Sequence, residues 1–285
     1  MAPPEKFLLA AVMGWPIMHS RSPLMHNFWL QQEGLNGAYL PIAIKPGKLE
    51  SGLRALSPLG FAGCNLTMPH KIDAMKIVDE VDDVAKIIGA VSCIVVRDNG
   101  TLFGTNNDWI GFLDSLKHKF PNWQAEKGPV AIIGAGGGGR AVCFAMLEQG
   151  ATDIRLLNRT PEEPRAIAQA FGGPINTVDW IDRHDALQGV QTVVNATNQG
   201  MGKEPALDIL LDKLPTDAIV ADIIYTPLET PFLAAGRKRG NPTINGLGML
   251  LYQGIPAWRL WFGVEPTVTH KLWNQMQKSI EEMFN

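Results

Sequence analysis

Cysteine is scarce in this chain, and neither sign of charge predominates. The 285 residues include 3 cysteines, and 25 lysines and arginines stand against 28 aspartates and glutamates, for a net charge of −3. The basic excess typical of nucleic-acid-binding proteins is therefore missing, and so is a run of like charges that would mark a membrane-surface segment. Cys64, Cys93 and Cys143 supply neither a disulfide framework nor a Cys-x-x-Cys metal pair. We expect them to be small buried side chains of a cytoplasmic protein with no metal site.

A long hydrophobic run is also missing. The apolar stretch 7–18 is too short to span a bilayer and contains Gly14 and Pro16. It leads directly into His19-Ser20-Arg21-Ser22 rather than into a small-residue cleavage site, so we do not expect a signal peptide.

Strand-like and helix-like segments alternate along most of the sequence, which predicts an α/β fold. We expect strands over 7–13, 38–44, 60–66, 130–133, 153–157, 192–197 and 218–224, and a hairpin over 92–105 that turns at Asp98-Asn99-Gly100. Helices are expected over 22–34, 49–56, 71–81, 108–120, 230–239, 248–262 and 265–284.

A glycine-rich segment comes after the apolar run 130–133 and leads into a helix that stops at Gly150. Its glycines at 134, 136 and 139 fit the G-x-G-x-x-G turn of a dinucleotide-binding βαβ unit. The first allows a tight turn, the second lets the backbone approach the pyrophosphate, and the third lets helix and strand pack closely. The helix N-terminus then offers N–H groups to the phosphates. We therefore expect a Rossmann-type domain over 108–245, preceded by an α/β domain over 1–107 that is completed by a helical return over 246–285.

The choice between NAD and NADP depends on the residues that end the next strand. NAD-binding units carry an acidic residue there for the ribose hydroxyls, but this chain continues Asn158-Arg159-Thr160. A guanidinium suits a 2′-phosphate, which favours NADP. The missing acidic residue also argues against an S-adenosylmethionine site, which usually needs a carboxylate for its ribose. NAD stays open, because Arg159 could simply end a strand and because Glu162 and Glu163 would weaken a positive site.

Polar clusters stand at three strand ends: 19–22, 65–71 and 104–108. Open α/β sheets place ligands at such ends. Helix capping alone would also account for Ser22 and Asp108, and Lys71 could be a solvated helix residue.

Taken together, these motifs resemble those of the shikimate dehydrogenase family and its quinate/shikimate relatives. The match includes Gly14-Trp-Pro-Ile-Met-His-Ser-Arg-Ser-Pro23, Asn65-Leu-Thr-Met-Pro-His-Lys71, the Gly134 loop, Asn158-Arg-Thr160, Asn195-Ala-Thr-Asn-Gln-Gly-Met201, Asp222-Ile-Ile-Tyr-Thr-Pro-Leu-Glu-Thr230 and Gly246-Leu-Gly-Met-Leu-Leu-Tyr-Gln-Gly254.

The resemblance implies a role for each matching residue. Lys71, paired with Asp108, would handle the proton as hydride passes to or from the nicotinamide. Residues that would bind the substrate are Ser20 and Ser22 at its carboxylate, and Asn65, Thr67, Asp108 and Gln253 around its ring. Residues that would bind the cofactor are Gly134, Gly136, Gly137, Gly138, Gly139, Asn158, Arg159, Thr160, Thr197 and Gly246.

Two departures fall among the expected substrate contacts. The family usually has Gly-Ala-Val-Asn-Thr where this chain has Gly89-Ala-Val-Ser-Cys93, and Asn-Thr-Asp where it has Asn106-Asn107-Asp108. Compared with the residues usual in the family, Ser92 is a shorter polar side chain than asparagine, and Asn107 is a longer one than threonine. Because a site built for one hydroxyl pattern rejects others, we expect altered substrate preference.

The resulting expectation is an NADP(H)-dependent oxidoreductase of the shikimate pathway of aromatic amino acid biosynthesis. It would interconvert a ring hydroxyl and a ketone on a 3-dehydroshikimate/shikimate type of acid, as a monomer or homodimer. A quinate or aminoshikimate dehydrogenase using NAD(H) is the alternative. A methylenetetrahydrofolate-type dehydrogenase suits the paired serines and Gln253 less well. A nucleotide-binding regulator of weak activity is supported only by Ser92 and Asn107.

Overall fold

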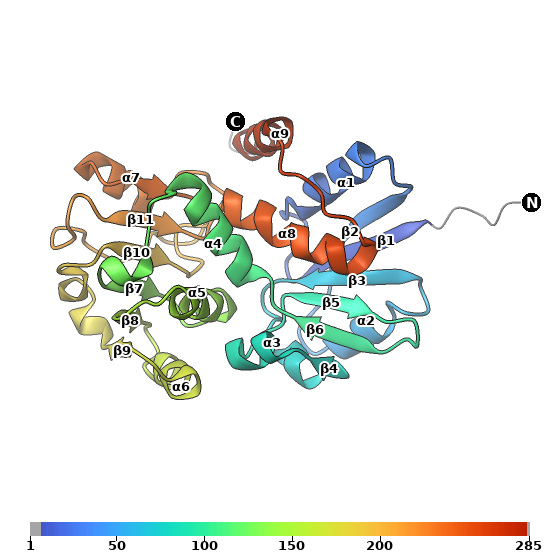
Figure 1. The fold of residues 1–285 in the computed structure, drawn as a ribbon, viewed down its shortest axis with the longest axis horizontal. Helices are drawn as coiled ribbons and strands as arrows, with labels where there is room; N and C mark the ends of the chain where they lie inside the picture. Colours follow the sequence, from blue (N-terminus) through green and yellow to red (C-terminus); the bar gives the residue numbers. More distant parts are fainter. Residues whose placement is uncertain (1–6, 284–285) are drawn as a thin grey trace, which may run out of the picture. The chain divides into compact units, whose positions relative to one another are not determined.

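The protein divides into two compact units, which a computed structural model describes over residues 7–283. Of the described residues, the first unit holds 7–107 together with Gln253–Met276, and the second holds Asp108–Tyr252 with 277–283. Each unit is built on a six-stranded sheet (Figure 1). The α/β architecture expected from the sequence is confirmed. The sequence assigned all of 246–285 to the first domain, whereas here 246–252 and 277–283 group with the second unit.

The sheet of the first unit is mixed, with the order β2-β1-β3-β5-β6-β4. Its central β1 pairs in parallel with β2 and β3, and β5 and β6 form the expected antiparallel hairpin. Since β5 runs against its neighbours, its start lies at the edge where β1, β3 and β6 end. We call this edge the polar edge. The strands are β1 (Leu8–Gly14), β2 (Gly37–Ala43), β3 (Phe61–Leu66), β4 (Glu80–Val81), β5 (Cys93–Val96) and β6 (Leu102–Thr105).

Short helices cover this sheet. They are α1 (Ser22–Gln32), α2 (Leu49–Arg54), α3 (Asp83–Ile88) and a 3₁₀ turn, η1 (Asp73–Lys76). Met13, Leu53 and Ile94 belong to one buried apolar cluster of this unit. Apolar burial of this kind is the main favourable term that holds the edge residues in place.

The sheet of the second unit is entirely parallel, in the order β12-β11-β10-β7-β8-β9. In the unit's own chain order this reads 6-5-4-1-2-3, the strand order of dinucleotide-binding folds. The order reverses between β7 and β10. The elements are α4 (Asp108–Lys119), η2 (Ala125–Lys127), β7 (Val130–Ile133), α5 (Gly137–Glu148), β8 (Ile154–Leu157), α6 (Glu162–Phe171), β9 (Ile175–Val178), η3 (Trp180–Asp182), η4 (Asp185–Leu187), β10 (Thr192–Asn195), β11 (Ile219–Asp222), α7 (Pro231–Arg239) and β12 (Thr243–Ile244).

Two helices close the chain, α8 (Leu247–Phe262) and α9 (His270–Glu281). The later part of α8 belongs to the first unit, where the buried Trp258 donates its indole N–H to His26 Nδ1 at 2.6 Å. The Trp261 indole donates to the Ile94 carbonyl in β5 at 2.8 Å. The helical return is therefore fixed to the first sheet by indole hydrogen bonds as well as by apolar packing.

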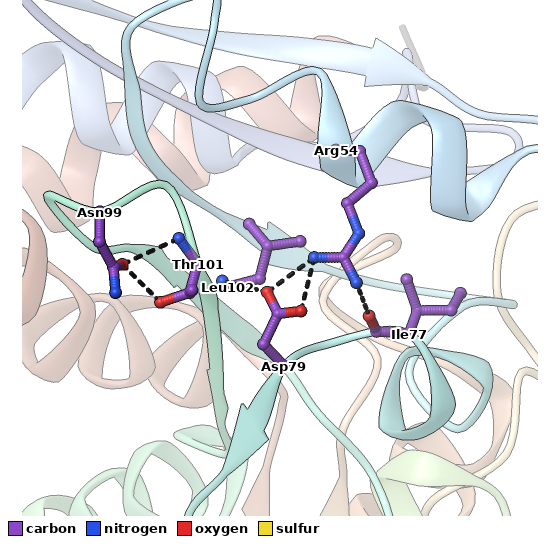
Figure 2. A network of polar contacts seen from close by, with 6 residues as sticks. All are labelled: Arg54, Ile77, Asp79, Asn99, Thr101 and Leu102. Carbon is purple, nitrogen blue, oxygen red and sulfur yellow. Dashed lines mark hydrogen bonds and ion pairs between the residues drawn. The ribbon is translucent and has the colours of Figure 1, made fainter.

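A network of polar contacts fixes the end of the β5–β6 hairpin that lies away from the polar edge (Figure 2). Arg54 contacts both carboxylate oxygens of Asp79, at 2.8 and 2.6 Å, and donates to the Ile77 carbonyl at 2.7 Å. The Leu102 N–H donates to the same carboxylate at 2.7 Å. The hydrogen bond from Arg54 lowers the pKa of Asp79, so this exposed network stays ionised at neutral pH.

The same contacts explain why the helix expected over 71–81 was wrong. Only the 3₁₀ turn Asp73–Lys76 forms there, and the chain then extends into β4. The Asp79 N–H donates to the Leu102 carbonyl, and β4 pairs with β6. Pairing with a distant strand thus overrides the local helical pattern.

Other differences from the expected elements are smaller. The last helix begins at His270 rather than near 265, because Pro266 interrupts the segment and Thr269 Oγ1 accepts from the Leu272 N–H as a cap. The sequence did not predict α3, α6, β9 or β12. Among residues 7–283, no helix combines the length and the apolar character needed to cross a membrane.

Candidate functional site

The polar edge begins with the two serines after β1. Helix α1 starts at Ser22, and no side chain caps it, so the expected capping by Ser22 is not observed. Instead the Ser22 N–H donates to Ser20 Oγ at 3.3 Å, which holds the two serines side by side. Ser22 is buried, and the first turn of α1 carries no acidic residue. Hydroxyls and a helix N-terminus together form an arrangement suited to a carboxylate.

Asn65 lies at the end of β3, with its side-chain amide held at both atoms. The Tyr39 hydroxyl from β2 donates to Asn65 Oδ1 at 2.7 Å, and Asn65 Nδ2 lies 3.4 Å from the Ser92 carbonyl oxygen. Tyr39 itself is buried and stacks on His26 with ring centroids 3.9 Å apart. These contacts fix which face of the Asn65 amide is presented at the edge.

Thr67 and Lys71 come after Asn65 on the segment beyond β3. The Thr67 N–H donates to the Met13 carbonyl, and a Cβ at Gly14 would lie 2.4 Å from the Thr67 methyl carbon. Only glycine at position 14 lets these segments approach so closely. The Lys71 carbonyl accepts from the Val91 N–H at 2.8 Å, which places the lysine backbone beside the residue that precedes Ser92.

Ser92 and Asn107 flank the β5–β6 hairpin and contact each other directly. Ser92 precedes β5, Asn107 comes two residues after β6, and they are 2% and 3% exposed. The Asn107 N–H donates to Ser92 Oγ at 2.9 Å. Within the described residues, Asn107 Nδ2 is buried without a hydrogen-bond partner. Such a donor costs roughly 1–3 kcal/mol unless something accepts from it.

Asp108 and Gln253 stand where the chain passes between the units. Asp108 is fully buried as the first residue of α4, and Gln253 is half-buried within α8. The division of the chain places Lys71 in the first unit and Asp108 in the second. The pairing of their side chains remains a prediction from the resemblance.

The glycine loop of the second unit has the close contacts that its pattern predicts. Gly134 has φ +111°, in the region that favours glycine. A Cβ on Gly139 would lie 2.0 Å from the Gly134 carbonyl oxygen, so the helix could not approach the strand with any other residue there. At Gly136 a Cβ would meet no atom of the described residues within 4 Å. The loop is therefore tight on its inner side and open beside Gly136, as a phosphate cradle requires.

The cradle continues into the first turn of α5, where Gly137 and Gly138 are half-buried. These residues and the α5 N-terminus fit a dinucleotide pyrophosphate. The backbone at Gly246 also packs closely against a neighbouring segment, because a Cβ there would lie 2.0 Å from the Ile223 carbonyl oxygen.

Thr197 is positioned by a buried polar network after β10 and β11. Asn195 Oδ1 accepts from the Thr197 N–H and hydroxyl at 3.0 and 2.7 Å, while Asn195 Nδ2 donates to the Asp222 carboxylate at 3.2 Å. The Thr230 hydroxyl donates to the same carboxylate at 2.7 Å. Burial raises the pKa of Asp222 to about 6, against the opposing effect of these hydrogen bonds.

The segment after β8 shows why the 2′-phosphate prediction is not straightforward. Arg159 and Thr160 are exposed, but Asn158 Nδ2 donates to Glu163 Oε2 at 2.7 Å. Arg140, half-buried in the first part of α5, has its pKa lowered by burial and raised in part by the charge of Glu163. A carboxylate therefore stands among the groups expected to receive the phosphate.

Four residues of these arrangements were not predicted from the sequence as site residues: Tyr39, Asn195, Asp222 and Arg140. A signal was present for three of them. Asn195 and Asp222 each end an apolar strand-like run, and Arg140 directly follows the last glycine of the loop. Tyr39 had no such signal, because it lies within the alternating pattern of its strand.

Three family descriptions match the sequence in chain order. "Shikimate dehydrogenase substrate binding domain" matches residues 12–94, "Shikimate / quinate 5-dehydrogenase" matches 114–207, and "Shikimate 5'-dehydrogenase C-terminal domain" matches 246–269. The three together span both compact units.

Known proteins similar to this chain agree with these matches. The shikimate dehydrogenase (NADP(+)) of Paramagnetospirillum magneticum is 48% identical over 267 residues, which cover 94% of this chain and 97% of that protein. Shikimate 5-dehydrogenase from Thermus thermophilus, in complex with NADP(H) and shikimate, is 35% identical with a TM-score of 0.84, over 97% of this chain and 99% of the other. Quinate dehydrogenase from Corynebacterium glutamicum, in complex with NAD, is 30% identical with a TM-score of 0.85, again over 97% and 99%.

Proposed function

Because this chain belongs to the shikimate dehydrogenase family, we propose that it interconverts a ring hydroxyl and a ketone on shikimate or a similar cyclic hydroxy acid, with NADP(H). The observation that carries the proposal is the grouping at the polar edge. Ser20, Asn65 and Lys71 come from separate parts of the first unit and lie on segments that meet at this edge. The glycine loop of the second unit supplies the matching cofactor cradle.

The residues of the first unit would bind and orient the acid. Ser20 and Ser22 would receive the carboxylate at the start of α1, and Asn65 and Thr67 would contact the ring hydroxyls. Gln253 would reach the same ring from α8. Such fixed polar contacts orient the reacting carbon and select for the hydroxyl pattern.

The reaction requires removal of a hydride and a proton from one secondary alcohol. NADP⁺, when bound, accepts the hydride from the carbon. We assign Lys71 to the hydroxyl proton: its amine takes that proton as the C–O bond becomes a carbonyl, and its ammonium returns it in the reverse reaction. The resemblance assigns Asp108 to the same step, as the carboxylate that accompanies the lysine.

The remaining assignments belong to the same proposal. We assign substrate binding and catalysis to 1–107 completed by 246–285, and NADP binding to 108–245. These are functional assignments, and their bounds differ from those of the compact units at 246–252 and 277–283. We propose a cytoplasmic location and a monomer or homodimer without a nucleic-acid partner. Cys64, Cys93 and Cys143 are buried and form no disulfide within the described part of the chain, which confirms the expectation of small buried side chains.

Substrate assays on the purified protein test the activity. We expect turnover of shikimate with NADP⁺, compared against quinate, an amino-substituted analogue and NAD⁺. The curated relatives named shikimate dehydrogenase (NADP(+)) support quinate and NAD less well. Tight NADP⁺ binding without turnover of any ring acid would favour a regulator instead, and would contradict the proposal.

Replacement of the proposed proton-transfer residue tests the mechanism. We expect Lys71→Ala to lower kcat by about 10²–10⁴-fold, the usual contribution of general acid–base catalysis, and to leave the Kd for NADP⁺ nearly unchanged. Lys76→Ala, at an exposed lysine of the following 3₁₀ turn, is the matched control. Near-normal kcat in Lys71→Ala would rule out the assigned role.

A further inference from the structure

The residues that break the family pattern, Ser92 and Asn107, are also bonded to each other. The Ser92 hydroxyl oxygen accepts from the Asn107 main-chain N–H at 2.9 Å. The Ser92 main chain is fixed in turn, since its N–H donates to the Thr105 carbonyl and its carbonyl accepts from the Leu66 N–H. Ser92 therefore has a rigid position from which its side chain holds the backbone at Asn107.

The side chain of Asn107 is the buried group that lacks a partner. Its Nδ2 is enclosed and donates to no described residue, although the neighbouring Asn106 donates to the Ala90 carbonyl at 2.9 Å. A buried amide N–H₂ of this kind requires an acceptor. Asn65, which also approaches Ser92, belongs to the proposed ring-binding set.

We propose that Ser92 and Asn107 act as one specificity unit, in which Asn107 Nδ2 donates to an oxygen of the substrate ring and Ser92 is the positioning residue that aims it. This inference rests on the proposed dehydrogenase function and specifies its substrate. The carboxamide that the family usually carries at position 92 is supplied here from position 107.

The chemistry of the donor selects among the candidate acids. A ring hydroxyl or ketone oxygen can accept from Nδ2, whereas an ammonium substituent carries only donors. An amino-substituted ring would set donor against donor in an enclosed site. The unit therefore accepts a hydroxyl at this position and rejects an amino group there.

A double-mutant cycle measures whether the two residues act together. The variants are Asn107→Ala, Ser92→Ala and the combination, with kcat/KM measured for shikimate and for amino-substituted analogues. We expect the wild-type protein to prefer the hydroxy acid by at least about tenfold, because sites built to bond a hydroxyl reject its replacement. Asn107→Ala should reduce that ratio towards one, Ser92→Ala should reduce it partly, and the combination should match Asn107→Ala alone.

A reciprocal exchange provides the rescue. Ser92→Asn with Asn107→Thr restores the pattern usual in the family, and we expect the double variant to use shikimate better than either single variant. Thermal unfolding and NADP⁺ binding of every variant serve as controls for folding. A purely structural role would lower kcat/KM for all acids alike and would leave the ratio unchanged.

The outcomes distinguish this inference from the proposed function. If the wild-type protein turns over shikimate but the two alanine substitutions act additively, or leave the preference unchanged, the inference is wrong and the activity stands. Preference for an amino-substituted acid would also overturn it. If the wild-type protein neither binds nor turns over any ring acid, the activity and the inference fail together.

Discussion

At the scale of single residues, three asparagines stand out because a different neighbour positions each of them, through the side chain of Asn65 and Asn158 and through the main chain of Asn107. Tyr39 orients Asn65, Ser92 holds the backbone of Asn107, and Glu163 accepts from Asn158. A carboxamide presents a donor on one side and an acceptor on the other, so its orientation decides what it can bind. The neighbour of each carboxamide is therefore as important as the carboxamide itself.

Glu163 offers a test of cofactor selection at this scale. We expect Glu163→Gln to tighten binding of NADP⁺ by roughly threefold and to change binding of NAD⁺ less, because removal of one exposed negative charge relieves repulsion of a 2′-phosphate. Titration calorimetry with both nucleotides gives the two Kd values directly.

Glu162→Gln is the matched control, since it removes the same charge from an exposed neighbour. If the two variants tighten NADP⁺ binding equally, overall charge sets the affinity for NADP⁺, rather than the contact between Glu163 and Asn158. Weaker NADP⁺ binding in Glu163→Gln would mean that the carboxylate orients Asn158 productively.

At the scale of elements, the turn between β7 and α5 contains glycines that are present for two different reasons. Gly139 is needed for packing, because its hydrogen faces the Gly134 carbonyl. Gly136 faces open space, so no atom of residues 7–283 prevents a side chain there. Its φ of −74° is also available to any residue. A glycine at that position fits the close approach of a bound pyrophosphate.

Alanine substitutions distinguish these two reasons. We expect Gly136→Ala to leave the thermal unfolding temperature nearly unchanged while weakening NADP⁺ binding at least about tenfold, since a methyl group would occupy the approach of the pyrophosphate. We expect Gly139→Ala to lower both the unfolding temperature and the affinity. Unchanged NADP⁺ binding in Gly136→Ala would contradict the phosphate cradle.

At the scale of the whole molecule, the helical return connects stability to pH through His26. Burial lowers the pKa of this imidazole to about 3, and its Nδ1 accepts from the Trp258 indole on α8. The unfolded chain would protonate His26 near pH 6.5, but the folded protein does not until the pH is far lower. Stability from this group is therefore complete above pH 6.5 and is lost as the pH falls towards 3.

The size of this effect can be measured by urea unfolding at about pH 7.5 and about pH 5.0. Over this interval we expect the free energy of unfolding to fall by roughly 2 kcal/mol more in the wild-type protein than in His26→Gln. The difference follows from a loss of about 1.4 kcal/mol for each pH unit below about 6.5. Glutamine keeps an acceptor for Trp258 but does not titrate. Parallel losses in the two proteins would show that His26 does not carry the pH dependence.

Much of this architecture could be predicted from the sequence because the signals are local. The apolar runs before the glycine loop and before Asn195 predict buried strands, and they appear as β7 and β10. The segment 71–81 was mistaken for a helix because its pairing with β6 depends on residues much further along the chain. Short edge elements such as β12 likewise have no pattern of their own.

For the candidate site too, local sequence signals predicted one part of the result and tertiary contacts decided the other. Sequence motifs indicated which residues belong to it, but they could not show that Tyr39 holds Asn65 or that Ser92 bonds to Asn107. The hairpin was predicted, yet the hydrogen bond forms beyond its last residue pair, Cys93 with Thr105. Such contacts depend on tertiary packing rather than on local preference.

The reversal of the chain between β5 and β6 has a consequence for how such a site changes over generations. It brings together two groups that are 15 residues apart in the chain, so their codons lie close together on one gene. Recombination within so short an interval seldom separates them, and the pair is inherited as a block. A library that randomises one codon at a time would sample only the single variants, whereas one oligonucleotide can vary both codons at once.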